Sequence, residues 1–274
     1  MRVVWICEAE IFGDDGNDIV ATAARALGSE VRPWRDDYWE RESWPRLDER
    51  VVLFRGALDN AKELPWSPGS LCSTERFHCS AYYPRAEPWL LQRPWRRTTV
   101  AELCAAQEEI AEEFRANELF VRPDSPLKPF AGRVVAMDTL TPETLDCGFY
   151  HDDDSLPVIV APRRQVEAEW RFVVVEGAVV AGSAYQADGR RAAASVTPAD
   201  APWRFAEEIA EGLEPPEAVY VLDVCRAERA FWLLELNPFS GADLYGCDGA
   251  AVVRAVEQWA ARTSGCRAPS TKRG

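Results

Sequence analysis

The chain has 274 residues, of which 47% are hydrophobic and 28% charged, values typical of a folded globular protein with room for two or three lobes. Its formal net charge of −14 argues against binding along a nucleic-acid backbone, which requires a basic surface. No apolar run approaches the roughly 20 residues that span a bilayer, and acids follow the first apolar residues too soon for a signal peptide. We therefore expect a cytoplasmic protein without nucleic-acid or membrane partners.

Residues 1–95 have the pattern of an N-terminal α/β domain. A helix is predicted over 18–27, and short apolar strands are predicted at 3–7, 31–34 and 51–54. Strands that alternate with a helix predict a parallel sheet. The stretch 34–46 is dense in Trp, Arg, Asp and Glu, and we interpret it as an exposed loop or short helix; a homodimer contact is one role for it. A segment rich in Pro and Trp, 86–95, is the predicted domain boundary.

Residues 96–265 are predicted to form a second domain of mixed strands and helices. Thr99 and Glu102 fit a capping box at the start of a helix that runs to Arg115. The other expected elements are strands at 118–122, 133–137 and 157–161, a short helix at 139–145, a hairpin of 169–175 and 178–185, and helices at 202–213 and 248–261. The last residues, 266–274, lack large apolar side chains and are expected to be disordered.

The cysteines carry no recognisable metal or redox motif. Eight are scattered along the chain without a Cys-x-x-Cys pair, a pattern typical of reduced, packed cysteines in a cytosolic protein. Cys72, His78 and Cys79 form the one cluster in the sequence, and its spacing matches no usual zinc site. The acidic run 152–154 is expected to be a solvated turn, because adjacent side chains in a loop rarely converge on a metal.

The stretch 220–245 predicts a hairpin that gathers oxygen-bearing side chains on one face. Apolar residues alternate in both strands, and a polar segment between them supplies the turn. Asp223 then shares a face with Glu235 and Asn237 of the second strand. Two registers are compatible with the turn, with Asp223 opposite Leu233 or opposite Glu235, and both bring the three Cβ atoms within roughly 5–8 Å. Such a set suits one or two hard cations; the alternative is a solvated face with scattered acids.

An Asp followed about a dozen residues later by Glu-x-Asn-Pro resembles the magnesium signature of the ATP-grasp superfamily. The run Leu-Glu-Leu-Asn-Pro-Phe-Ser at 234–240 is similar to the end of the ATP-grasp catalytic domain, and the resemblance extends over residues 99–262. It implies an α/β (α+β) fold in which a Rossmann-like pre-ATP-grasp lobe precedes a two-lobed ATP-grasp domain. It also implies ATP and Mg²⁺ as cofactors, with the metal held by Asp223, Glu235 and Asn237.

Upstream segments resemble the nucleotide-binding parts of the family in the same order. Residues 118–123 are similar to the strand that ends in a cation for the ATP phosphates, here Arg122 where many members have lysine. Residues 125–132 are similar to the phosphate loop, with Lys128 as a second cation. On these residues alone, a surface loop with one exposed lysine is the favoured interpretation, and the order of the other segments supports the phosphate loop.

The next segment resembles the hinge strand whose backbone binds the adenine edge, which implies a role for Val160 and Ala161. Glu167 or Glu169 would then contact the ribose. Glu169-x-Arg171 resembles the acid-x-Arg segment of the family, which implies that Arg171 contacts the transferred phosphoryl group. The alternative for this pair is a surface ion pair of small energy.

The resemblance implies a ligase that joins a carboxylate to an amine through an acyl-phosphate and releases ADP and phosphate. Arg171 and Lys128 would be its catalytic side chains, and the two substrates would be small molecules or peptides. Two alternatives stay open. One is a nucleotide-binding module without turnover that serves as a sensor or interaction subunit, and the other is a kinase built on the same fold.

Overall fold

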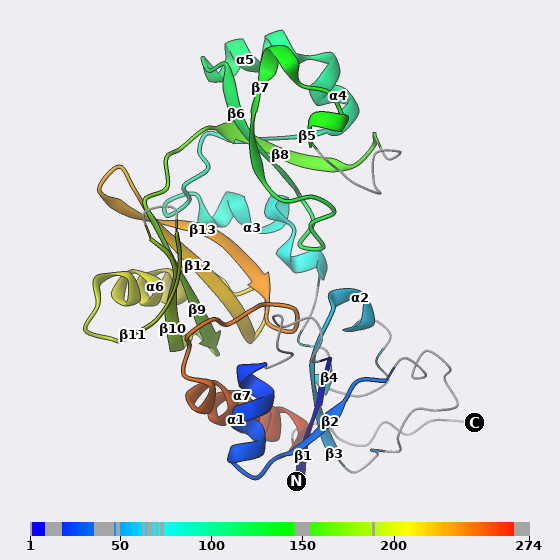
Figure 1. Ribbon diagram of the computed structural model, residues 1–274, viewed down its shortest axis with the longest axis vertical. Coiled ribbons are helices and arrows are strands. Elements are labelled where there is room, and N and C mark those ends of the chain that lie inside the picture. The colour runs from blue at the N-terminus through cyan, green and yellow to red at the C-terminus, as the bar shows by residue number, and fades with distance from the viewer. Residues whose placement is uncertain are drawn as a thin grey trace.

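Three sheets lie one after another along the long axis of the molecule (Figure 1). The computed structural model describes residues 2–8, 18–35, 47, 50–61, 64, 68–69, 71, 74–145, 154–187 and 190–265. The N-terminal sheet lies at one end, a five-stranded sheet occupies the middle, and a small four-stranded lobe lies at the other end.

The N-terminal sheet is parallel, as the alternation of strands and helix predicts. Its strands β1 (Arg2–Cys7), β2 (Glu30–Pro33), β3 (Arg50–Arg55) and β4 (Pro68–Gly69) have the order β2-β1-β3-β4. Helix α1 (Ile19–Ala26) starts at Asp18, whose carboxylate accepts hydrogen bonds from two backbone N–H groups of the first turn. The short helix α2 (Leu58–Ala61) follows β3 and lies on the side of the N-terminal sheet that is nearer to the middle sheet (Figure 1).

The small lobe is an antiparallel sheet of order β5-β8-β6-β7 with two helices on one face. Its elements are β5 (Arg96–Thr99), α4 (Val100–Ala105), α5 (Gln107–Phe114), β6 (Glu118–Pro123), β7 (Arg133–Ala136) and β8 (Pro157–Pro162). The predicted capping box between Thr99 and Glu102 is present. The predicted single helix is two helices, because Ala106 leaves helical geometry between them (φ −114°, ψ 29°). The expected helix over 139–145 is reduced to 3₁₀ turns at Met137–Thr139 and Glu143–Leu145.

The middle sheet is antiparallel and buried on both faces. Its strands β9 (Ala168–Val175), β10 (Ala178–Ala187), β11 (Arg190–Val196), β12 (Val219–Ala227) and β13 (Ala230–Pro238) have the order β11-β10-β9-β12-β13. One face packs against α3 (Cys79–Ala86) and α6 (Ala201–Gly212). The other packs against α7 (Gly249–Gly265), α1 and the N-terminal sheet (Figure 1). The sequence does not predict β11 or α3.

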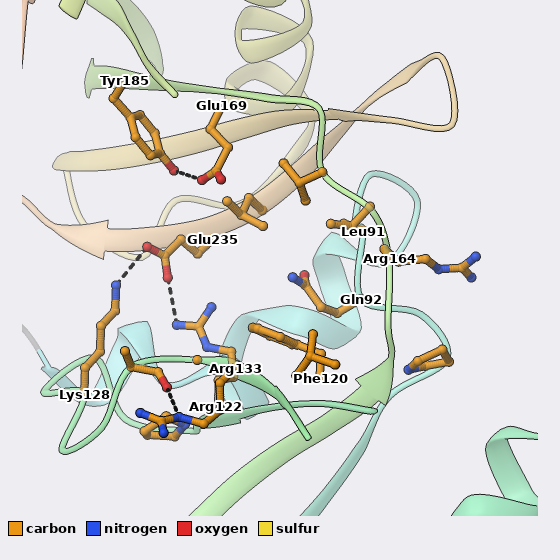
Figure 2. A pocket seen from close by; sticks show the side chains of 17 residues that line it. Leu91, Gln92, Phe120, Arg122, Lys128, Arg133, Arg164, Glu169, Tyr185 and Glu235 are labelled. Carbon is orange, nitrogen blue, oxygen red and sulfur yellow. Dashed lines mark hydrogen bonds and ion pairs between the residues drawn. The ribbon is translucent and has the colours of Figure 1, made fainter. Parts of the chain in front are cut away.

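The segment that joins the N-terminal part to the small lobe runs beside β13. Leu90 forms a parallel bridge with Leu233, the Leu91 N–H donates to the Leu233 carbonyl, and the Leu233 N–H donates to the Trp89 carbonyl. This predicted boundary segment thus extends the edge of the middle sheet by a few residues. The next residue along, Gln92, lies where the small lobe and the middle sheet face each other (Figure 2).

A fully buried ion pair connects the N-terminal sheet to the chain that follows β13. The Arg55 guanidinium lies 3.0 Å from the Asp18 carboxylate and donates to the carbonyls of Phe239 and Ser240 at 2.5 and 3.1 Å. The Ser240 hydroxyl in turn donates to the Phe54 carbonyl at 2.9 Å. These contacts fix the loop after β13, just beyond the end of that strand, against the N-terminal sheet.

Several sequence expectations fall outside the described residues: most of the Trp-rich stretch 34–46, Cys72, Asp152, Asp153 and the tail 266–274. Within the described part of the cysteine cluster, Cys79 is buried and His78 lies 3.6 Å from the Asp124 carboxylate. In the same part of the chain, no helix combines the length and apolar character needed to cross a bilayer.

Candidate functional site

Three charged side chains form a row across neighbouring strands of the middle sheet. Asp223 of β12 pairs in register with Arg171 of β9 on one side and with Glu235 of β13 on the other. Of the two registers that the hairpin turn allows, the structure has the one that opposes the two acids. A bulge directly after Asp223 shifts the register, so that Leu233 opposes Val224 instead.

The Arg171 guanidinium is hydrogen-bonded on two sides. Its Nε and Nη2 donate to the two Asp223 carboxylate oxygens at 2.8 and 2.7 Å, and its Nη1 donates to the Asp243 carbonyl at 2.7 Å. Burial opposes the charge on the guanidinium, but the adjacent Asp223 carboxylate keeps the pKa of Arg171 above its ordinary value. The rings of Tyr185 and Tyr245 are stacked on each other. The guanidinium carbon of Arg171 lies 5.4 and 5.2 Å from their respective centroids, within the range of a cation–π interaction.

Glu235 is the meeting point of two further cations (Figure 2). Lys128 donates from Nζ to Oε1 at 2.8 Å, and a terminal nitrogen of Arg122 lies 2.8 Å from Oε2. Burial favours the neutral acid, but these two cations hold the pKa of Glu235 well below its usual range. Strand β6 and the loop after it, far from β13 in sequence, therefore close over the same carboxylate.

The predicted metal ligands converge in a way that fits a hard cation. The Asn237 amide nitrogen donates to Asp223 Oδ2 at 3.3 Å and to Glu235 Oε1 at 2.9 Å, so oxygens of both carboxylates point at one position. A flip of that amide brings its oxygen to the same place, which completes three oxygen donors of the kind Mg²⁺ prefers. This set of candidate ligands consists of two acids and one amide. Among the described residues, no group of three His, Cys, Asp or Glu side chains is placed to hold a metal ion.

A cavity of about 440 Å³ opens beside this row, between the small lobe and the middle sheet (Figure 2). Its volume lies in the usual range for a site that holds a small molecule. One end is polar and is lined by Arg122, Lys128, Glu169, Tyr185 and Glu235. On the side away from Lys128, Figure 2 shows Leu91, Phe120, Gln92 and Arg164, and the apolar residues Pro162, Val166 and Leu234 also line the cavity. A molecule with a flat apolar part and an anionic part would match these two ends.

The two acids considered for a sugar contact differ in position. Glu169 lines the cavity, accepts a hydrogen bond from the Tyr185 hydroxyl, and has a pKa raised by burial. Glu167 is not among the lining residues and pairs with Arg226 at 2.8 Å.

Val160 and Ala161 are fully buried in β8, and neither lines the cavity. Val160 has register partners on both sides, in β5 and β6, whereas the register of Ala161 and Pro162 runs with β6 alone. The lining begins at Pro162, where β8 ends. The chain therefore reaches the cavity just beyond the two residues that the sequence comparison singled out.

A second, smaller cavity of about 130 Å³ shares Lys128 with the first. Arg171, Asn237 and Asp243 line it from the middle sheet and the chain after it, and Leu58 lines it from α2 of the N-terminal part. Gly241 lies at this junction, where an added Cβ would come within 3.0 Å of the Leu58 side chain.

Comparison with known proteins identifies the family. The family model described as the ATP-grasp domain, R2K clade family 2, matches residues 91–255, more than half of the chain. The chain belongs to this ATP-grasp family. The superfamily resemblance carried by Asp223 and the Glu-x-Asn-Pro run is thereby confirmed.

Solved structures of ATP-grasp proteins share the fold along almost the whole chain. The D-cycloserine synthetase DcsG has a TM-score of 0.60 at 15% identity, over 95% of this chain and 99% of that one. A RimK domain ATP-grasp protein from Sphaerobacter thermophilus has a TM-score of 0.56 at 15% identity, over 91% and 98%. The ATP-grasp ligase PsnB, complexed with a minimal precursor, has a TM-score of 0.56 at 13% identity, over 94% and 99%. No curated protein matches the sequence. At these identities the likeness establishes the mixed α/β ATP-grasp fold that the sequence predicts.

Several residues that line the cavity carry no recognisable sequence motif, among them Gln92, Phe120, Tyr185 and Leu234. Alternation along 178–185 and 230–238 places Tyr185 and Leu234 on a definite face, but gives no reason to assign either a ligand. Gln92 carries no signal in the sequence, since it lies in an irregular segment and reaches the cavity only because Leu91 is tied to β13.

Proposed function

We propose that this ATP-grasp protein is an ATP- and Mg²⁺-dependent ligase that joins a carboxylate to an amine through an acyl-phosphate. The observation that carries the proposal is the charge of the cavity lining. Four cations, Arg122, Lys128, Arg133 and Arg164, line the cavity together with two acids, Glu169 and Glu235. Positive charge therefore exceeds negative charge around a semi-enclosed site, which favours an anionic ligand.

Different parts of the cavity would bind the base, the ribose and the phosphates of ATP. The apolar end suits the base, with the end of β8 beside Val160 and Ala161 available to it. Glu169 is the better of the two acids for the ribose, because it lines the cavity whereas Glu167 does not. Arg122 and Lys128 would hold the phosphates, since both cations already face the cavity and can exchange the Glu235 carboxylate for phosphate oxygens.

The metal would be held by Asp223, Glu235 and Asn237, whose polar atoms meet at one position. The chemistry that the ion would supply at these residues is neutralisation of the charge that develops on the phosphate oxygens during transfer. In the ligand-free protein Arg171, Lys128 and Arg122 neutralise the same acids, so nucleotide binding and metal binding would be coupled. A structure of PsnB complexed with Mg and ADP is consistent with this pairing in a protein of the same fold.

The proposed reaction has two steps. A carboxylate oxygen of the acid attacks the γ-phosphorus, the bond to ADP breaks, and an acyl-phosphate forms. An amine then attacks the acyl carbon, and orthophosphate leaves with the oxygen that the carboxylate supplied. Arg171 would stabilise the phosphoryl oxygens, because its guanidinium is fixed by Asp223 and the Asp243 carbonyl.

The smaller cavity is our candidate for the carboxylate that accepts the phosphoryl group. Two cations, Lys128 and Arg171, line it on the side of the proposed phosphates. Small acids and the side chains of peptides both have carboxylates of suitable size; the fold neighbours include a D-cycloserine synthetase and a ligase complexed with a precursor peptide.

A screen for ADP release tests the proposal. Purified protein with ATP and Mg²⁺ is incubated with pools of amino acids, small carboxylic acids and short peptides, each with an amine pool. We expect ADP and orthophosphate to accumulate one for one with an amide product in at least one pool. ADP together with a stable phosphorylated product would indicate the kinase alternative, and nucleotide binding without turnover in every pool would favour the sensor alternative.

A further inference from the structure

Gln92 is a buried polar side chain whose acceptor is unsatisfied. Its side chain is 4% exposed, and its Oε1 has no hydrogen-bond partner among the described residues. A buried carboxamide oxygen without a partner destabilises a fold, because its hydrogen bond to water is lost and not replaced. Figure 2 shows the amide end of Gln92 directed toward the interior of the 440 Å³ cavity, which Gln92 helps to line. An orphaned group in such a position suggests that a ligand completes its hydrogen bonds.

The neighbours of Gln92 fix its position and define the part of the cavity that it faces. Leu91, immediately before it, is hydrogen-bonded to Leu233 of β13. Arg93, immediately after it, accepts a hydrogen bond at its carbonyl from Arg164, which lies beyond β8. These hydrogen bonds hold Gln92 between the middle sheet and the chain after β8, on the side of the cavity where Leu91 and Phe120 supply apolar surface (Figure 2).

The chemistry of a carboxamide selects among bases that could occupy this end. An amide presents one acceptor and one donor side by side, which pairs with the 6-amino group and N7 of adenine. At the same edge guanine offers two acceptors, O6 and N7, so the carboxamide oxygen is left without a donor. A base that cannot satisfy a buried polar group is disfavoured strongly, because the desolvation cost of that group is not recovered.

We infer that Gln92 binds the 6-amino edge of adenine and makes the nucleotide site selective for ATP over GTP. The inference rests on the proposed function, in that a nucleotide occupies the cavity. It adds a side-chain contact to the base that neither the family match nor the sequence motifs assign.

The test compares ADP, GDP and the diphosphate of purine riboside, which lacks the 6-amino group, by calorimetry in the presence of Mg²⁺. For the wild-type protein we expect ADP to bind at least tenfold more tightly than either analogue. Gln92→Met keeps the size of the side chain and removes both polar atoms, and should reduce the preference for ADP over the purine riboside nucleotide to less than threefold. Gln165→Met is the matched control, because Gln165 is exposed and does not line the cavity; it should keep the wild-type preference.

A melting curve without nucleotide separates this role from a structural one. Because Gln92→Met removes an unsatisfied acceptor, the ligand-free variant should melt at the wild-type temperature or above it. A variant that unfolds would mean that Gln92 is a structural partner, and the inference would be overturned.

The wild-type protein provides an independent check. Equal affinity for ADP and the purine riboside nucleotide would overturn the role of Gln92 while leaving the proposed function intact. A failure of all three nucleotides to bind would overturn the proposed function, and the inference with it.

Discussion

The substitution Glu235→Gln separates the two roles that the structure gives this carboxylate. In the ligand-free protein Glu235 neutralises Arg122 and Lys128 at 2.8 Å each. With nucleotide bound, we propose that it coordinates the metal. Glutamine keeps the shape of the side chain and one acceptor oxygen, but removes the charge that both roles require.

The expected loss of stability follows from the burial of the partners. Removing one member of a buried ion pair costs about 3–5 kcal/mol, because the remaining charge is unpaired. Arg122 is only 6% exposed, whereas the Lys128 side chain is 37% exposed and can turn to water. The amide oxygen of the introduced glutamine would keep one contact, so we expect a loss of about 2–3 kcal/mol and a fall in melting temperature of roughly 5–10 °C.

Calorimetry of ADP with and without Mg²⁺ is the decisive assay for this variant. In the wild-type protein Mg²⁺ should strengthen ADP binding roughly tenfold or more, and in the variant by less than about threefold. Metal-free ADP should bind the variant as well as the wild type or better, because Lys128 is released for the phosphates. Glu118→Gln, which removes a surface pair with Arg163, is the control and should change neither value. An undiminished effect of Mg²⁺ in the Glu235→Gln variant would refute its assignment as a metal ligand.

Three further predictions follow from named contacts. Lys128→Ala should raise the dissociation constant of ADP roughly tenfold, through loss of one charge-assisted phosphate contact; an unchanged affinity by calorimetry would remove Lys128 from the site. Arg55→Met should cost about 3–5 kcal/mol in urea unfolding because it leaves Asp18 buried and unpaired, and the double variant with Asp18→Asn should recover much of that loss; an equal loss in both would show that the contacts of Arg55 to the carbonyls dominate. Because the pKa of Glu235 is lower in the folded than in the unfolded protein, its ionised carboxylate stabilises the fold at neutral pH. This stabilisation is lost as the pH falls below about 4.3, the pKa of an unfolded glutamate, toward the lower pKa of the folded state. Urea unfolding between pH 7 and pH 3 should therefore show a steeper loss for the wild type than for Glu235→Gln, and parallel curves would contradict the ion pairs seen here.

Strands β9, β10, β12 and β13 of the middle sheet are predictable because their signals are local. Alternation of apolar and polar residues identifies the faces of β9, β12 and β13, and the turn between β12 and β13 places Asp223 and Glu235 on a common face. The turn alone allows two registers, because alternation does not predict the bulge that follows Asp223 between β12 and β13. The resemblance to the ATP-grasp superfamily then predicts that Asp223 and Glu235 bind a metal ion and that Arg171 contacts the phosphoryl group.

The elements that escaped prediction depend on distant residues. Helix α3 contains Pro84 and has little apolar periodicity, and its first turn is held by Asp124, which accepts from the Ser80 N–H at 2.7 Å. Strand β11 is a run of Arg, Ala and Ser with low strand propensity, and it exists as an edge strand because β10 pairs with it. Gln92 escaped for the same reason, because its position is set by β13, which comes much later in the chain.

The most direct test of the account follows an oxygen atom from the acid to phosphate. Once the ADP screen identifies an acid, that acid is labelled with ¹⁸O in its carboxylate and incubated with ATP, Mg²⁺ and the amine. The proposed mechanism predicts one ¹⁸O atom in each orthophosphate released, because the carboxylate oxygen that attacks the γ-phosphorus leaves with the phosphate. Unlabelled orthophosphate, or the appearance of AMP and pyrophosphate, would contradict the acyl-phosphate mechanism.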